Sequence, residues 1–150
     1  MYLVPQKSQY AIRALFELAK RYGQGPAKIA DIAKAQAIPV RFLEVILSQL
    51  KQGGFVDSQR GAEGGYFLVR DPRSLAVGEI LRFLQGPIAP VGCLTGEPKD
   101  KCSLYGDCVF LPMWQKVGRA ISEVYDSTAF QDLVEQDRRR ASRYVSSYSI

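Results

Sequence analysis

The chain has 150 residues, enough for one domain with a hydrophobic core or for one small domain with a dimerisation arm. A hydrophobic content of 47% excludes wholesale disorder, and the absence of a long apolar run excludes a transmembrane helix. The net charge of +5 suits a polyanionic partner, and the N-terminus lacks the layout of a signal peptide, so we expect a cytoplasmic protein with no membrane association.

The first expected helix runs from Ser8 to Tyr22, because apolar residues recur on one face and Gly23 follows. Ser8 is placed to act as its N-cap, since a serine hydroxyl can accept from the free backbone N–H groups of a first turn. A helix N-terminus also suits a phosphate. We therefore expect Lys7, Ser8 and Gln9 to lie at a phosphate-binding position, with an ordinary cap as the alternative.

Two further helices are expected within residues 27–53. Ile29 and Ile32 have helical spacing in the first. Pro39 cannot continue that helix, because it lacks an N–H group, but it suits the first turn of the next one. The second helix carries an apolar stripe that ends at Gly53-Gly54. The stripe consists of Leu43, Ile46, Leu47 and Leu50.

Two strand-like segments follow, residues 55–60 and 66–70, with a glycine-rich segment between them. Glycine permits the positive φ angles of a sharp reversal. The order of helix, turn, helix and hairpin predicts a winged helix-turn-helix, mainly α with a small β-wing. Its second helix would enter a major groove of DNA, and its hairpin would reach the backbone or the minor groove. The alternative is a small helical domain with an incidental hairpin.

The expected DNA contacts are at the start of the first helix, off the apolar stripe, and on the wing. A carboxylate can accept only from a donor such as the cytosine amino group, so we expect Glu44 to discriminate between sequences. The alternative is a solvated helix charge, either alone or paired with Arg41. Arg60 is expected to hold the backbone or the minor groove. The full set is Ser8, Gln9, Tyr10, Lys28, Arg41, Glu44, Ser48, Gln49, Lys51, Arg60, Gly64 and Gly65.

A short helix is expected from Val77, closed by Gly86-Pro87. The following segment, residues 87–109, contains all three cysteines, and loops of this length without regular structure are often functional. The chain is thus expected to divide into a winged-helix domain (residues 1–86), this cysteine segment, and a C-terminal helical part (residues 110–150).

Pro112 is expected to start a helix with an apolar stripe over about four turns. We expect it to be a long dimerisation helix, because palindromic DNA sites require a two-fold axis, although a core helix is the alternative. A last helix near residues 128–145 carries the basic run Arg138-Arg139-Arg140, which is either a DNA contact or a solvated face. The last five residues are expected to fray.

Three motifs resemble the Rrf2 family of bacterial transcription regulators. They are Gln9-Tyr10-Ala11 near the start, residues 60–66 in the expected wing, and residues 76–80 after it. The resemblance covers nearly the whole chain and keeps the motifs in order. It implies a dimeric winged-helix repressor or activator. The family has a branch that binds an iron–sulphur cluster and a cluster-free branch.

The cysteines are spaced Cys93-x8-Cys102-x5-Cys108, and the chain has no histidine. Thiolates on a flexible loop can converge on one soft metal centre, and iron–sulphur clusters normally take four such ligands. An odd number of cysteines in a chain expected to be cytoplasmic argues against a disulfide framework. The resemblance implies that the three cysteines bind an iron–sulphur cluster, with [2Fe–2S] favoured over [4Fe–4S]. The Cys102–Cys108 interval, with Trp114 after it, matches the cluster branch, whereas the first interval is longer than in that branch.

The fourth ligand is open. Part of the cluster branch has a histidine three residues after the last cysteine, where this chain has Leu111. Another part uses an aspartate just before the tyrosine of the first helix, donated by the partner subunit, where this chain has Gln9. Neither ligand therefore transfers. The candidates are Asp107, Asp100, Glu97, Ser8 and Gln9, or an exogenous thiol or water.

We therefore expect a dimeric transcription regulator, more a repressor than an activator, that binds palindromic double-stranded DNA. Its affinity would be controlled by an iron–sulphur cluster that senses redox, iron or nitric oxide status. The alternative is a cluster-free regulator of the same fold, controlled by a protein partner or by a cysteine thiol–disulfide switch. An enzyme is not expected, because the chain lacks a histidine, a paired nucleophile and base, and a phosphate loop.

Overall fold

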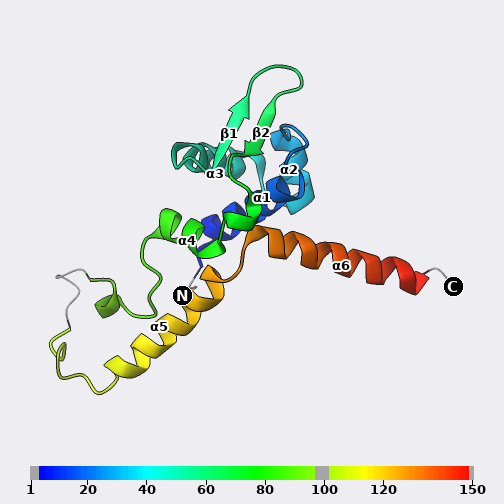
Figure 1. The fold of residues 1–150 in the computed structure, drawn as a ribbon. Helices are drawn as coiled ribbons and strands as arrows, with labels where there is room; N and C mark the ends of the chain where they lie inside the picture. Colours follow the sequence, from blue (N-terminus) through cyan, green and yellow to red (C-terminus); the bar gives the residue numbers. More distant parts are fainter. Residues whose placement is uncertain (1–3, 97–101, 149–150) are drawn as a thin grey trace.

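A computed structural model describes residues 4–96 and 102–148. This part of the chain forms six α-helices, two 3-10 helices and one two-stranded antiparallel sheet, which confirms a mainly helical winged helix-turn-helix fold with long C-terminal helices. Residues 4–86 form a head that ends in the hairpin, and two helices leave the head in different directions (Figure 1). The elements of the head are α1 (Gln6–Lys20), α2 (Ile29–Gln36), α3 (Val40–Gln52), β1 (Val56–Gln59), β2 (Gly65–Leu68), η1 (Pro72–Ser74) and α4 (Val77–Gln85).

The turn between α2 and α3 follows from the sequence around Pro39. Ala37 ends α2 in the left-handed conformation with φ of 52°, and the Ile38 N–H donates to the carbonyl of Ala33 at 3.0 Å. Pro39 is the N-cap of α3, as its fixed φ and missing N–H group favour. The helix then ends at Gly53, as expected. This turn fixes the direction of α3 relative to α2.

The prediction that Ser8 caps the first helix is wrong. α1 begins at Gln6 with Pro5 as its N-cap, and no side chain caps it. Ser8 lies inside the first turn and is only 3% exposed. Because proline already has a φ angle close to that of a helix, the helix can start directly after it. The Ser8 side chain is therefore not placed to contact a phosphate.

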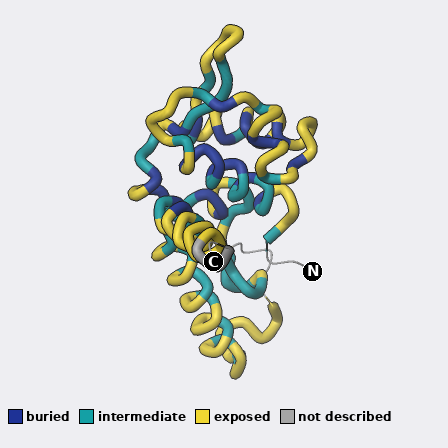
Figure 2. The backbone as a smooth tube through the Cα atoms, turned by 90° about the vertical axis from the view of Figure 1, so that its right-hand side faces the viewer, coloured by how far each residue is buried: buried dark blue, intermediate teal, exposed yellow. Residues whose placement is uncertain are grey.

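The hydrophobic core lies in the head, where Figure 2 shows the buried segments, while the wing tip and the C-terminal helices are mostly exposed. Apolar side chains of α1, α2, α3 and α4 meet there, and Leu68 joins them from β2. Phe130 and Val134 of α6 (Phe130–Tyr148) belong to the same core, with exposed fractions of 0% and 1%. The last helix is thus anchored in the head by its first turns.

Backbone pairing fixes the point where the C-terminal helices join the head. Ala76 and Ala129 form an isolated antiparallel bridge just before α4 and α6. The Val77 N–H donates to the Thr128 carbonyl at 2.9 Å, and the Phe130 N–H donates to the Leu75 carbonyl at 3.0 Å. The end of α5 (Leu111–Asp126) is therefore held against the start of α4.

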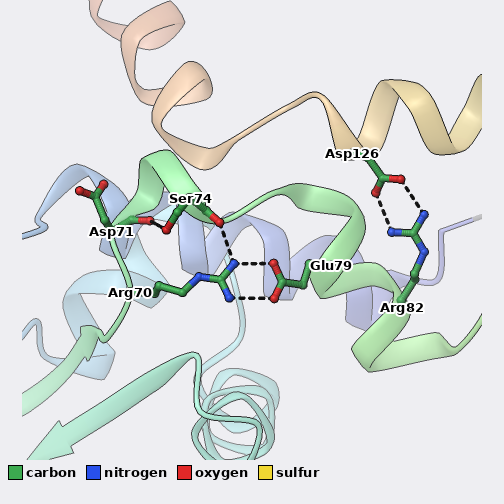
Figure 3. A network of polar contacts seen from close by, with 6 residues as sticks. All are labelled: Arg70, Asp71, Ser74, Glu79, Arg82 and Asp126. Atoms are coloured by element: carbon green, nitrogen blue, oxygen red, sulfur yellow. Dashed lines mark hydrogen bonds and ion pairs between the residues drawn. The ribbon is translucent and has the colours of Figure 1, made fainter.

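Two arginine–carboxylate pairs strengthen this junction (Figure 3). Arg70, at the end of the wing, donates to both carboxylate oxygens of Glu79 on α4 and to the Ser74 carbonyl at 2.7 Å. Arg82 of α4 donates to both oxygens of Asp126 at 2.6 and 2.9 Å. Hydrogen bonds from the arginines hold the pKa of each carboxyl below its ordinary value. α4 is thus tied to the wing on one side and to α5 on the other.

The last helix differs from the expectation at its end. α6 continues to Tyr148, three residues beyond the expected limit, so the predicted fraying does not reach residues 146–148. Residues 149 and 150 lie outside the described part of the chain. α1 and α6 run side by side where Ile12 and Phe16 face Leu133 across a shallow hollow.

The anchoring of α6 predicts a difference between two valine truncations. Val134→Ala should lower the free energy of unfolding by about 2 kcal/mol, because it removes two buried methyl groups and leaves a cavity. Val45→Ala, at a position 60% exposed on α3, should change it by less than about 0.5 kcal/mol. Urea-induced unfolding at one protein concentration measures both. Equal losses would show that α6 is not part of the folded core.

The Arg70–Glu79 pair predicts a pH-dependent contribution to stability. The pKa of Glu79 lies below its ordinary value of 4.5, so the pair stabilises the fold above that pH, and the contribution is lost as the pH falls through the lower folded-state value. Glu79→Gln should therefore cost up to about 1 kcal/mol at pH 7, since the pair is partly exposed, and less at a pH well below 4.5. Glu63→Gln, at the exposed wing tip, is the control in the same urea titrations. A Glu79→Gln loss that is equal at both pH values would refute this role.

Candidate nucleic-acid interface and cysteine segment

The outer face of α3 is polar and free of contacts with the core. Its buried stripe, the four apolar residues expected from the sequence, faces α1 and α2. On the opposite face, a shallow hollow of about 460 Å³ runs along the helix. Its lining residues are Glu44, Val45, Ser48, Gln49 and Gln52. This face offers hydrogen-bond donors, acceptors and one apolar group in a row, which is the chemistry that a major groove requires.

Arg41 and Glu44 point outward separately. Both are exposed, and the Arg41 guanidinium lies over the Phe42 ring at 4.8 Å from its centroid. Within residues 4–96, no ion pair joins Glu44 to Arg41, so the alternative in which the two neutralise each other is not what the structure contains. The carboxylate of Glu44 is therefore available to an external donor.

The wing is positioned by a close backbone approach. Ala27 pairs with Tyr66 through two backbone hydrogen bonds of 2.8 Å, and a Cβ at Gly65 would collide with the Ala27 carbonyl. A Cβ at Gly64 would collide with the Gln59 carbonyl. These glycines, expected as DNA contacts, thus have a steric reason to be glycine. Arg60 is exposed where the hairpin turns.

Lys51 connects α3 to the wing. Its ammonium group donates to the Ser58 hydroxyl at 2.6 Å and lies 3.6 Å from the Asp57 carboxylate. The residue was expected to contact DNA directly. In the structure its charge is partly offset by Asp57, and its contacts hold β1 against the end of α3.

The start of α1 lies beside α3. Tyr10 stacks on Phe42 with ring centroids 6.4 Å apart, and both line a mainly apolar hollow of about 420 Å³ between the two helices. The Gln9 amide donates to the Val4 carbonyl at 2.9 Å. Lys28 is exposed at the N-cap of α2. Four contacts were expected here and at the start of α2: Ser8, Gln9, Tyr10 and Lys28. Lys28 is the exposed cation among them, and Ser8 is buried.

Two arginines of the basic run on α6 have acidic neighbours. Asp137 lies 3.4 Å from Lys20 and 3.7 Å from Arg140, and Arg139 lies 3.8 Å from Glu135. All three arginines of the run are exposed. The run is thus a solvated helix face in the free protein, and its contact with DNA stays a prediction.

The cysteine segment leads from α4 to α5. Cys93 lies in the 3-10 helix η2 (Gly92–Leu94), and Cys102 is exposed. Cys108 lies three residues before α5, and its carbonyl accepts from the Leu111 N–H at 3.2 Å. All three are free thiols. Asp107 is exposed next to Cys108, whereas Asp100 and Glu97 lie outside the described residues.

The side chains of this segment supply part of the ligand set that an iron–sulphur cluster needs. Three thiols supply three of the usual four ligands, and histidine is absent. In residues 4–96 and 102–148, no group of three or more histidine, cysteine, aspartate or glutamate side chains is gathered closely enough to hold a metal ion. The described residues alone therefore do not form a closed site, and the convergence of the three thiols on one metal centre stays a prediction.

Val45 is a residue that the sequence prediction missed. It is 60% exposed on the outer face of α3, yet it is apolar and adjacent to the buried stripe. The signal in the sequence was its spacing, which falls outside the i, i+3, i+4, i+7 pattern of the stripe.

No helix in the described part of the chain is long and apolar enough to cross a membrane.

Comparisons with known proteins agree with this geometry. Residues 4–136 match the Rrf2 family, described as an iron-dependent transcriptional regulator. The HTH-type transcriptional regulator CymR of Bacillus subtilis is 37% identical over 142 residues, which cover 95% of this chain and 96% of that protein. These matches identify a family of transcriptional regulators and not of enzymes, as the sequence predicted.

Solved structures agree as well. The structure of CymR, the global cysteine regulator of B. subtilis, has a TM-score of 0.74 at 35% identity and covers 91% of this chain and 98% of its own. The structure of IscR from T. potens has a TM-score of 0.72 at 34% identity and covers 89% of this chain and 87% of its own. The chain therefore belongs to the Rrf2 family of winged-helix, DNA-binding transcriptional regulators.

Proposed function

We propose that this protein is a homodimeric regulator that binds a palindromic operator through α3 and the wing and is controlled by the cysteine segment. The observation that carries the proposal is the outer face of α3, which presents Arg41, Glu44 and Ser48 to solvent, together with Arg60, which is exposed on the wing. Lys51 links the two elements, so they can approach DNA as one surface.

The dimer is supported by α5. None of the described side chains of this 16-residue helix is buried, although it carries an apolar stripe. Met113 is 48% exposed, Val117 is 37% exposed and Val124 is 63% exposed. An apolar stripe on a helix that leaves the head calls for a partner surface, and a second copy of α5 offers the same stripe related by a two-fold axis. Such a dimer would place two copies of α3 on half-sites about 34 Å apart.

A randomised-site selection tests which residues choose the sequence. The wild-type protein should select an inverted repeat. Glu44→Ala should bind as tightly or more tightly and accept more sequences, because it removes a carboxylate that repels acceptors in the groove. Arg60→Ala should weaken all sites by about tenfold, because it removes a charge-assisted contact to the backbone or the minor groove.

Glu135→Ala is the matched carboxylate control, since Glu135 lies on α6 away from the outer face of α3. It should leave both motif and affinity unchanged. An unaltered motif with Glu44→Ala would refute its role as a discriminator. A selected motif without two-fold symmetry would count against the dimer.

We further propose that the cysteine segment binds an iron–sulphur cluster. Three cysteines within 16 residues and the description of the family as iron-dependent support this proposal. When bound, such a cluster would supply a redox-sensitive and iron-sensitive centre. Since the described residues do not gather the donors, binding would require the segment to rearrange, as is common for metal sites that form with their metal.

Anaerobic purification with iron and sulphide analysis tests the cluster. The wild-type protein should be coloured and contain both elements. Cys93→Ala, Cys102→Ala and Cys108→Ala should each lose the visible absorption and the iron, because each removes one of only three thiolate ligands. Ser103→Ala, in the same segment, should retain them. Full iron content in one cysteine variant would exclude that residue as a ligand.

A thiol–disulfide switch is the second candidate function. The observation that favours it is that all three cysteines are free thiols and at least partly accessible to solvent. In that case the anaerobic protein would contain no iron, and a mild thiol oxidant would change the operator affinity of the wild type but not of the variant that lacks the responsible cysteine. The iron analysis above therefore separates the two candidates.

A further inference from the structure

Val45 occupies an unusual position for an exposed apolar residue. It lies one turn after Arg41 and three residues before Ser48, so the three side chains share the outer face of α3. The buried stripe of the helix faces the opposite way, and Val45 is 60% exposed. No described element of the head covers it. A side chain in this position is solvated in the free protein, and it would contact any ligand that binds the outer face of α3.

The surroundings of Val45 are polar on one side and apolar on the other. It lines the polar hollow together with Glu44, Ser48 and Gln49, and it also lines the apolar hollow that contains Tyr10 and Phe42. The Val45 side chain thus separates the polar hollow from the apolar one. The hydrogen-bonding groups on its polar side would fix the position of a base edge, and the valine would then meet the apolar part of that edge.

The major groove has one apolar group on its base edges, the C5-methyl group of thymine. A branched aliphatic side chain buries that methyl group well. Cytosine has only a hydrogen at C5, so it offers no methyl group to bury, and an aliphatic side chain cannot donate a hydrogen bond to a purine N7. We propose that Val45 selects thymine in each operator half-site through contact with this methyl group. The proposal rests on the proposed DNA-binding function of α3 and adds a base preference that Glu44 and Arg41 do not supply.

An alternative use of Val45 is contact with a protein. The neighbouring exposed residues Val40 and Phe42 are also apolar, with exposed fractions of 46% and 45%. DNA is favoured because Val45 is surrounded on the same helix face by Arg41, Ser48 and Gln49, whose polar groups match base edges and phosphates. Val40 lies at the first position of α3, toward the other edge of the exposed face. It therefore serves as a matched control.

The test uses uracil, which differs from thymine only by the missing methyl group. A site selected by the wild-type protein is synthesised with each thymine of a half-site replaced in turn by uracil, and the dissociation constants are measured by fluorescence anisotropy. One replacement should weaken wild-type binding by about fourfold, the effect of one buried methyl group. Val45→Ala should bind the thymine and uracil versions of that site equally. Val40→Ala should retain the wild-type difference.

The outcomes separate the two levels of the proposal. If the wild-type protein selects a sequence but no thymine in it is sensitive to uracil, the contact is wrong while the proposed function stands. If Val45→Ala retains the full uracil penalty, another residue reads the methyl group and the assignment is overturned. If the wild-type protein selects no sequence at all, the proposed function fails and the contact with it. Because Val45→Ala removes only exposed methyl groups, the variant should fold normally.

Discussion

The structure depends on the junction in which residues 75–77 pair with residues 128–130. Two backbone hydrogen bonds and the buried ring of Phe130 attach the C-terminal helices to a head that already has its own core. Arg82 and Asp126 close the same junction from the other side of α4. A Cβ at Gly78 would collide with the Asp126 carboxylate, so the two helices also approach more closely than a larger residue would allow. The end of α5 is therefore held to the head at this junction.

This constraint bears on how the cysteine segment could act. The segment begins after α4 and ends at the start of α5, while the end of α5 is held to α4 by Arg82 and by the backbone pairing. A change in the segment would therefore act first on the free start of α5, where the apolar stripe begins. Through Arg70 and Glu79, α4 is also tied to the wing. The wing and the proposed dimer helix are thus both bonded to one element of the head, α4.

The DNA surface combines rigidity with mixed chemistry. The close approach of Gly65 to Ala27 and the contacts of Lys51 with β1 fix the wing relative to α2 and α3. The outer face of α3 then presents a cation, a carboxylate, a hydroxyl and an aliphatic group on consecutive turns. Positively charged groups bind the phosphate backbone without sequence preference, whereas the carboxylate and the aliphatic group are compatible with only some base edges. Affinity and selectivity are therefore expected to reside in different side chains.

The sequence by itself determined the features that depend on local spacing and local backbone chemistry. The apolar stripes identified α3 and α4, Pro39 and Pro112 marked helix starts, and the glycine-rich segment marked the wing. Tertiary structure decided what depends on residues far apart in the chain. The prediction of a Ser8 cap was wrong because α1 starts directly after Pro5 and the serine is buried. Lys51 contacts Ser58 and Asp57 because β1 lies beside the end of α3. The pairing of residues 75–77 with 128–130 and the exposure of Val45 likewise follow from how the elements pack, which no local periodicity encodes.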